Sequence, residues 1–224
     1  LILTNGKFHT VDRTQPLASA VAIKAGKFLA VGSDAEVMRY AGEGTSVVDL
    51  KGHTVIPGLN DSHLHLIRGG LNYNLELRWE GVPSLADALR MLKDQAARTP
   101  SPQWVRVVGG WSEFQFAERR MPTLEELNQA APDTPVFVLH LYDRALLNRA
   151  ALQVVEYTKD TPNPPGGEIQ RDDKGNPTGM LIARPNATIL YATLAKGPKL
   201  PLEAQINSTR QFMRELNRLG LTSA

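Results

Sequence analysis

The stretch from Val55 to His65 reads VIPGLNDSHLH and separates two kinds of sequence. Before it, short apolar runs alternate with turn dipeptides such as Asn5-Gly6, which is typical of small β-structure. After it, apolar runs of strand length alternate with longer segments of helical period, which is typical of an α/β fold. We therefore predict an α/β chain in two parts, residues 1–58 and residues 59–224.

Within this stretch the spacing of polar residues indicates a metal site. If residues 59–66 form a strand, Asp61, His63 and His65 point to the same face, because side chains on a strand alternate. Two imidazoles on one face can bind a single metal ion, and Asp61 behind them can orient a ring. The alternative reading is a pair of polar residues on an exposed strand.

The metal is constrained by composition. The chain has no Cys, so only nitrogen and oxygen ligands are available. Imidazole and carboxylate ligands suit zinc, iron, manganese or nickel, and we take zinc as the first expectation.

The remaining pattern predicts the elements around this motif. Ser33, Ser84 and Thr123 each precede an acidic residue by three positions, which predicts helices that begin there. We also predict tight hairpins at Asn5-Gly6 and at 25–27, strands at 104–108 and 136–139, a helix at 145–155, an irregular loop at 158–167, a hairpin joining 169–171 to 180–182, and a helix at 203–219. Gly220 and the residues after it resemble the opening of another strand, so we expect the chain to be an N-terminal fragment.

Composition excludes several classes of protein. There are 25 Lys and Arg against 23 Asp and Glu, a formal net charge of +2, and the basic residues are interleaved with acids. We expect no nucleic-acid partner and no membrane span, because no basic patch and no long apolar run is present. A small-molecule substrate remains the expected partner. The absence of Cys and of a visible signal peptide favours the cytoplasm, although the chain opens at Leu1.

Several motifs together resemble one family. Residues 55–65 are similar to the V-x-P-G-x-x-D-x-H-x-H motif of the amidohydrolase superfamily. Residues 109–113 (GGWSE) and 118–123 (ERRMPT) resemble the G-W-x-E…E-x-R-x-P-T tract of its amidohydrolase-3 branch, which includes N-substituted formamide deformylase-like proteins. Residues 161–169 (TPNPPGGEI) and 175–179 (GNPTG) resemble a further tract of that branch.

The resemblance implies a metal-dependent (β/α)₈ barrel hydrolase with a small β-sandwich before it. Residues 1–58 would contribute to the sandwich, residues 59–224 would begin the barrel, and about 70–200 would be an inserted α/β region. The barrel would be incomplete here. The implied reaction is hydrolysis of a non-peptide carbon–nitrogen bond, as in amides, formamides or cyclic amides. His63 and His65 would bind the metal, and the catalytic residues would lie beyond Ala224. The fragment alone would be inactive, and its open barrel edge would favour self-association into a homo-oligomer.

Two departures from the family pattern leave a rival open. Asp143 stands where the family often has His, and Ala183-Arg184 stands where a Glu is common. We therefore also consider a non-catalytic regulatory or binding protein that keeps the fold. Trp111, His140 and Asp143 are candidates for a substrate pocket; for Trp111 and His140 the alternative is an ordinary role in the core.

Overall fold

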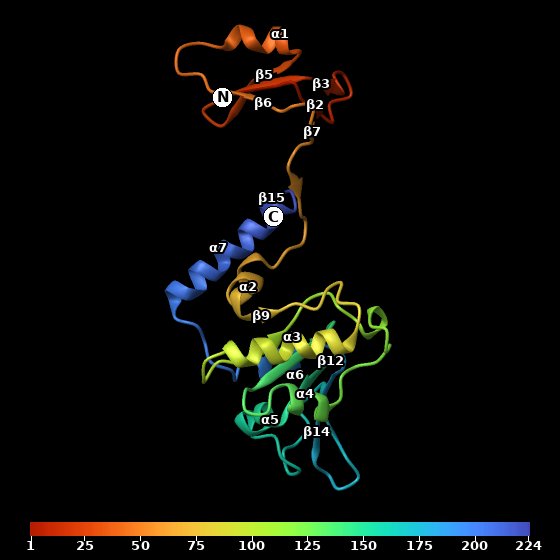
Figure 1. Ribbon diagram of the computed structural model, residues 1–224. Coiled ribbons are helices and arrows are strands. Elements are labelled where there is room, and N and C mark those ends of the chain that lie inside the picture. Colours follow the sequence, from red (N-terminus) through yellow and green to blue (C-terminus); the bar gives the residue numbers. More distant parts are fainter. The chain divides into compact units, whose positions relative to one another are not determined.

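The computed structural model describes residues 1–224, which form two compact units. One unit contains Leu1–Leu64 and Glu215–Ala224, and the other contains His65–Arg214. The division along the chain therefore falls after Leu64, later than the change of composition at Gly58. Figure 1 gives the course of the chain through both units. None of the helices is long and apolar enough to cross a membrane.

The first unit holds two small sheets and one parallel strand pair. The larger sheet has the order β5-β4-β1-β6, and the smaller has the order β3-β2-β7. The bounds are β1 (Ile2–Thr4), β2 (Lys7–His9), β3 (Leu17–Ala18), β4 (Ala20–Lys24), β5 (Lys27–Gly32), β6 (Val47–Asp49) and β7 (Thr54–Val55). Helix α1 (Asp34–Val37) follows the predicted cap at Ser33, which accepts from the Glu36 amide.

The two predicted hairpins in this unit have different outcomes. The turn at Ala25-Gly26 joins antiparallel strands β4 and β5, with positive φ at both residues, as expected. The hairpin predicted at Asn5-Gly6 is wrong. Asn5 does turn the chain, with φ of 53°, but β1 and β2 enter different sheets. Both edges of β1 are already paired, with β4 and β6, so β2 has no free edge to join.

The strand pair in this unit joins distant parts of the chain. β8 (Leu59–Asn60) runs parallel to β15 (Leu221–Ser223), with Leu221 opposite Leu59. The strand predicted after Gly220 is therefore confirmed. Gly58 makes this approach feasible, because a Cβ there would lie only 2.1 Å from the Thr222 hydroxyl oxygen.

The second unit is built on a six-stranded mixed sheet. Its order is β13-β14-β12-β11-β10-β9, with β9, β10 and β11 parallel and the others antiparallel. The strands are β9 (Glu76–Leu77), β10 (Val105–Val107), β11 (Val136–His140), β12 (Arg144–Leu147), β13 (Gly167–Arg171) and β14 (Pro177–Ala183). The helices are α2 (Leu66–Gly70), α3 (Leu85–Arg98), α4 (Leu124–Ala130), α5 (Arg149–Val155), α6 (Thr188–Leu194) and α7 (Leu202–Arg218), the last of which continues into the first unit.

Alternation along the central strands gives the sheet two buried faces. Val105, Val107 and Val138 pack in one core cluster with residues of α3 and α4. Phe137 and Leu139 belong to a second cluster with residues of α5 and α6. Neighbouring residues of one strand therefore serve opposite cores, as expected for a strand covered on both faces. Figure 1 shows α3, in yellow, running across the sheet.

The helix predicted at 145–155 is wrong at its start. Residues 144–147 form β12, which pairs with β11 on one side and β14 on the other, and the helix begins only after Asn148. Ala145 and the two leucines after it suit a helix locally, but pairing with two strands remote in sequence decides their structure. Asn148 then separates strand from helix: its side-chain oxygen accepts from the amides of Val136 and Ala151, both at 2.9 Å.

Candidate functional site

The segment that carries the predicted metal ligands is not an extended strand. β8 ends at Asn60, and the chain bends at Ser62 and His63. The Asp61 carboxylate accepts a hydrogen bond from the His63 amide at 2.8 Å, a local turn that replaces strand pairing. The predicted alternation of side chains on one face therefore fails beyond Asn60.

The two histidines themselves are exposed, and His65 lies directly before α2. No group of three or more His, Cys, Asp or Glu side chains in residues 1–224 is arranged to hold a metal ion. A catalytic zinc usually has three protein ligands. Imidazole is a suitable ligand for such a metal, but this motif supplies only two imidazoles, those of His63 and His65. The orienting role of Asp61 stays a prediction.

The largest of three described cavities lies in the second unit and has a volume of about 420 Å³. Residues after the carboxyl ends of β10 and β11 line it, including Gly110 and Tyr142. This is the edge at which α/β sheets commonly bind ligands. His65 is also in the wall, with Arg68 of α2 and Tyr191 of α6. One predicted metal ligand is thus placed beside a cavity.

Charged groups in the wall of this cavity are mostly basic. Arg106 projects from the middle of β10 and is only 6% exposed. Its Nη2 donates to the Pro198 carbonyl at 3.2 Å, but its Nε has no partner. Burial lowers the pKa of Arg106, and Glu76 counteracts this. Glu76 itself bonds Arg78 at 2.6 Å, and burial raises its pKa. Sequence reasoning missed Arg106, although an arginine within an apolar strand was a visible signal.

Two tyrosines, Tyr142 and Tyr191, line the same cavity. The Tyr142 and Tyr191 ring centroids lie 6.2 Å apart, and the Arg68 guanidinium lies 4.8 Å from the Tyr191 ring centroid. Burial, with a hydrogen bond to Tyr142, raises the pKa of Tyr191 to about 12. The Tyr191 phenol is therefore neutral at pH 7 and can donate a hydrogen bond.

The predicted pocket residue His140 ends β11 and is held between two carboxylates. Its Nε2 lies 2.6 Å from Glu113 Oε2, and its Nδ1 lies 2.8 Å from Asp143 Oδ1. Ionised carboxylates only accept, so both bonds form when the ring carries both protons. Although burial opposes it, hydrogen bonds from His140 and other donors lower the pKa of both carboxyl groups. Arg144 also donates to Asp143, at 3.0 Å.

The three predicted pocket residues have different surroundings. Trp111 is fully buried among Trp79 and Phe116 and donates to the Leu139 carbonyl, which favours its core reading. Neither Trp111 nor His140 lines any of the described cavities, whereas Asp143 lines one of about 310 Å³ with Arg144, Ala183 and Arg184. Their contact with substrate stays a prediction.

Comparison with known proteins decides the family. The model of the amidohydrolase family (Amidohydro_3) matches residues 46–224. The chain belongs to the amidohydrolase family. It is 34% identical over 184 residues to N-substituted formamide deformylase from Arthrobacter pascens, covering 81% of this chain and 34% of that protein. It is 36% identical over 183 residues to the protein LONG AFTER FAR-RED 3 from Arabidopsis thaliana, covering 81% of this chain and 31% of that protein.

This amidohydrolase-family chain therefore spans about a third of the length of those curated relatives. Its fold is similar to that of a crystal structure described as an uncharacterized metal-dependent hydrolase from Pyrococcus furiosus, with a TM-score of 0.60 and 24% identity. That match covers 99% of this chain and 43% of the other. The amidohydrolase resemblance in the motifs is thereby confirmed at the level of family.

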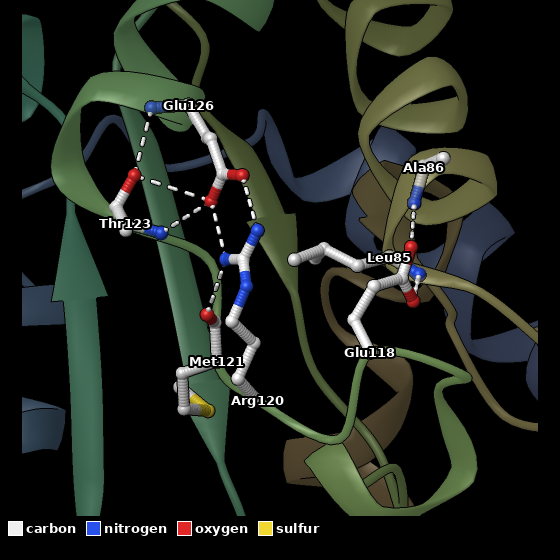
Figure 2. Close-up of polar contacts among 7 residues, drawn as sticks. All are labelled: Leu85, Ala86, Glu118, Arg120, Met121, Thr123 and Glu126. Carbon is white, nitrogen blue, oxygen red and sulfur yellow. Dashed lines mark hydrogen bonds and ion pairs between the residues drawn. The ribbon is translucent and has the colours of Figure 1, made fainter.

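One tract of the amidohydrolase resemblance has a structural role (Figure 2). The Glu118 carboxylate accepts from the Leu85 and Ala86 amides at the start of α3, at 2.8 and 3.4 Å. Arg120 binds Glu126 through two bonds of 2.8 and 2.7 Å, and Glu126 closes the cap with Thr123. The pKa of Glu126 falls to about 2, chiefly because Arg120 donates to it. This tract fixes helices, and it lines none of the three described cavities.

Proposed function

We propose that the complete protein is a metal-dependent hydrolase of non-peptide carbon–nitrogen bonds, such as those of amides, formamides or cyclic amides. Membership of the amidohydrolase family supports this class of reaction. The observation that supports a site at this cavity is that His65 lies in the wall of the 420 Å³ cavity.

In this proposal His63 and His65 hold a divalent metal, with zinc first and iron, manganese or nickel as alternatives. When bound, such a metal polarises a carbonyl and lowers the pKa of water toward about 7. The protein's own groups would bind and orient the substrate. Tyr191 supplies a neutral hydroxyl, and Arg106 supplies a buried positive charge beside the same space. Ligands and catalytic groups besides these two histidines are expected from parts of the protein outside residues 1–224.

The test uses the complete protein loaded in turn with zinc, iron and manganese, and a panel of linear amides, formamides and cyclic amides. We expect hydrolysis of at least one class, and His63→Ala and His65→Ala should each reduce it to background and lower the bound metal. His9→Ala is the matched control, because His9 is an exposed histidine on β2. Unchanged metal content and activity in both motif variants would refute the ligand assignment.

The same measurements separate the rival, a non-catalytic protein that keeps the fold. The hydrogen-bonded position of Asp143, where the family often has His, motivates that rival. Metal bound through His63 and His65, with no hydrolysis across the whole panel, would support it.

A further inference from the structure

The cavity beside His65 contains a buried cation without an adequate partner inside the protein. Arg106 lies between Val105 and Val107, which face the opposite core, so its guanidinium enters the α6 side of the sheet. It makes one hydrogen bond, to the Pro198 carbonyl, and no ion pair. A buried charge is costly unless it is paired. An anion bound in the cavity would offset this cost.

The surrounding charges do not neutralise it. The wall carries three guanidinium groups, those of Arg68, Arg78 and Arg106, and a single carboxylate, Glu76. That carboxylate is already bonded to Arg78 at 2.6 Å. The Arg68 guanidinium carbon lies over the Tyr191 ring, 4.8 Å from its centroid, a contact with the ring face that needs none of the N–H donors of Arg68. The cavity therefore has an excess of positive charge and unused donors.

The rest of the wall selects among anions. Val108, Leu139 and Leu194 add apolar surface, and the Tyr142 and Tyr191 rings add aromatic surface. A small hydrated ion such as phosphate gains nothing from such walls. A planar carboxylate on an apolar body matches both features, because guanidinium binds carboxylate in a fork geometry.

We propose that this cavity binds a carboxylate joined to an aromatic or aliphatic body, with Arg106 and Arg68 as its anion-binding groups. The inference rests on the proposed function for its meaning, since it makes the substrate an amide that bears a carboxylate. Its binding chemistry is separate from the hydrolytic step.

A neighbouring cavity provides an internal control. Arg106 and Tyr191 also line a cavity of about 350 Å³ in the same unit. Lys199 lines this 350 Å³ cavity but not the 420 Å³ cavity. Arg68 and Arg78 line only the 420 Å³ cavity. Variants of Arg68 and Lys199 therefore report which of the two spaces holds the anion.

The experiment is calorimetric titration of the complete, as-purified protein with benzoate and with benzamide, which share a shape but differ in charge. We expect benzoate to bind about tenfold or more tightly than benzamide. Arg106→Gln should lower the affinity for benzoate about tenfold, and Arg68→Gln should lower it several-fold. Lys199→Gln should leave the affinity for benzoate unchanged. Arg68 is exposed, so its variant tests the inference even if Arg106→Gln fails to fold.

Four results would overturn the inference. The first two are equal affinity for benzoate and benzamide, and binding of inorganic phosphate more tightly than benzoate. The third is loss of benzoate binding in Lys199→Gln but not in Arg68→Gln. The fourth is loss of benzoate binding in His63→Ala, which would place the carboxylate on a metal. Benzoate binding without hydrolysis of any amide would defeat only the proposed function. Hydrolysis of an amide by a protein that binds benzoate no more tightly than benzamide would defeat only this inference.

Discussion

His140 and Arg106 are both charged or chargeable side chains buried in the second unit, on neighbouring parallel strands, but their surroundings differ. His140 has a carboxylate at each ring nitrogen and packs edge-on against Trp111. Arg106 has one carbonyl, an unpartnered Nε and a cavity beside it.

This difference separates a structural group from a binding group. Where every donor and acceptor is satisfied, the side chain stabilises the fold and has no capacity left for a ligand. Where a buried cation lacks partners, its desolvation is not offset within the protein, and a ligand can complete it. The following variants test whether the two positions behave as this comparison requires.

The largest expected effect is at His140. His140→Leu removes the ring that the Glu113 and Asp143 carboxylates both bind, and leaves both without that partner. We expect the free energy of unfolding to fall by about 3 kcal/mol, toward the lower end for a broken buried pair because Asp143 is half-exposed. Urea denaturation measures this. His53→Leu is the control, because His53 is exposed. A loss below about 1 kcal/mol would show that the network is not structural.

Arg106→Met should behave in the opposite way. An apolar side chain of similar length removes the unpaired charge, so we expect the free energy of unfolding to stay within about 1 kcal/mol or to rise. The affinity for benzoate should nevertheless fall at least about tenfold, as in Arg106→Gln. Urea denaturation and calorimetric titration on the same preparation test both parts. A fall in stability as large as that of His140→Leu would mean that Arg106 is a structural group too.

The sequence predicted elements well where local signals decide them. The caps at Ser84 and Thr123 mark the starts of α3 and α4, because each hydroxyl accepts from the amide three positions later within one turn. At Thr123 the Glu126 carboxylate also accepts from the Thr123 amide, which completes a capping box. The prediction from the sequence failed for β12, where residues that favour a helix locally form a strand because they pair with β11 and β14. It failed also after Asn60, where Asp61 turns the chain by binding the His63 amide.

The site was predictable in part for the same reason. The spacing of His63 and His65 is local and visible, and the motifs carried the family. Arg106 acquires its meaning only when α2 and α6 bring Arg68 and Tyr191 to the same space. No periodicity along the chain encodes that meeting.

The partly buried, fully paired carboxylate of Glu126 gives an intermediate case. The pKa of Glu126 is lowered from 4.5 to about 2, so its bonds to Arg120 and Thr123 stabilise the fold above pH 4.5 and are lost as pH falls toward 2. Glu126→Gln should lower the free energy of unfolding by about 1 kcal/mol at pH 7, since solvent screens the pair. The difference from the parent should shrink from pH 4.5 to pH 2 in acid-dependent denaturation curves. A constant difference would contradict this origin.

The smallest expected effect is at Glu118, whose carboxylate is exposed and binds only helix-end amides. Glu118→Gln keeps an acceptor oxygen and removes the charge, so Tm should fall less than in Glu126→Gln. Glu118→Ala removes both the acceptor oxygen and the charge, so its Tm should fall further. Added salt should reduce the Tm difference between Glu118→Gln and the parent, but not the Tm difference between Glu118→Ala and Glu118→Gln. If instead Glu118→Gln abolished amide hydrolysis with Tm unchanged, this tract would act on substrate. The rule drawn from His140 and Arg106, that satisfied groups are structural, would then fail at its simplest test.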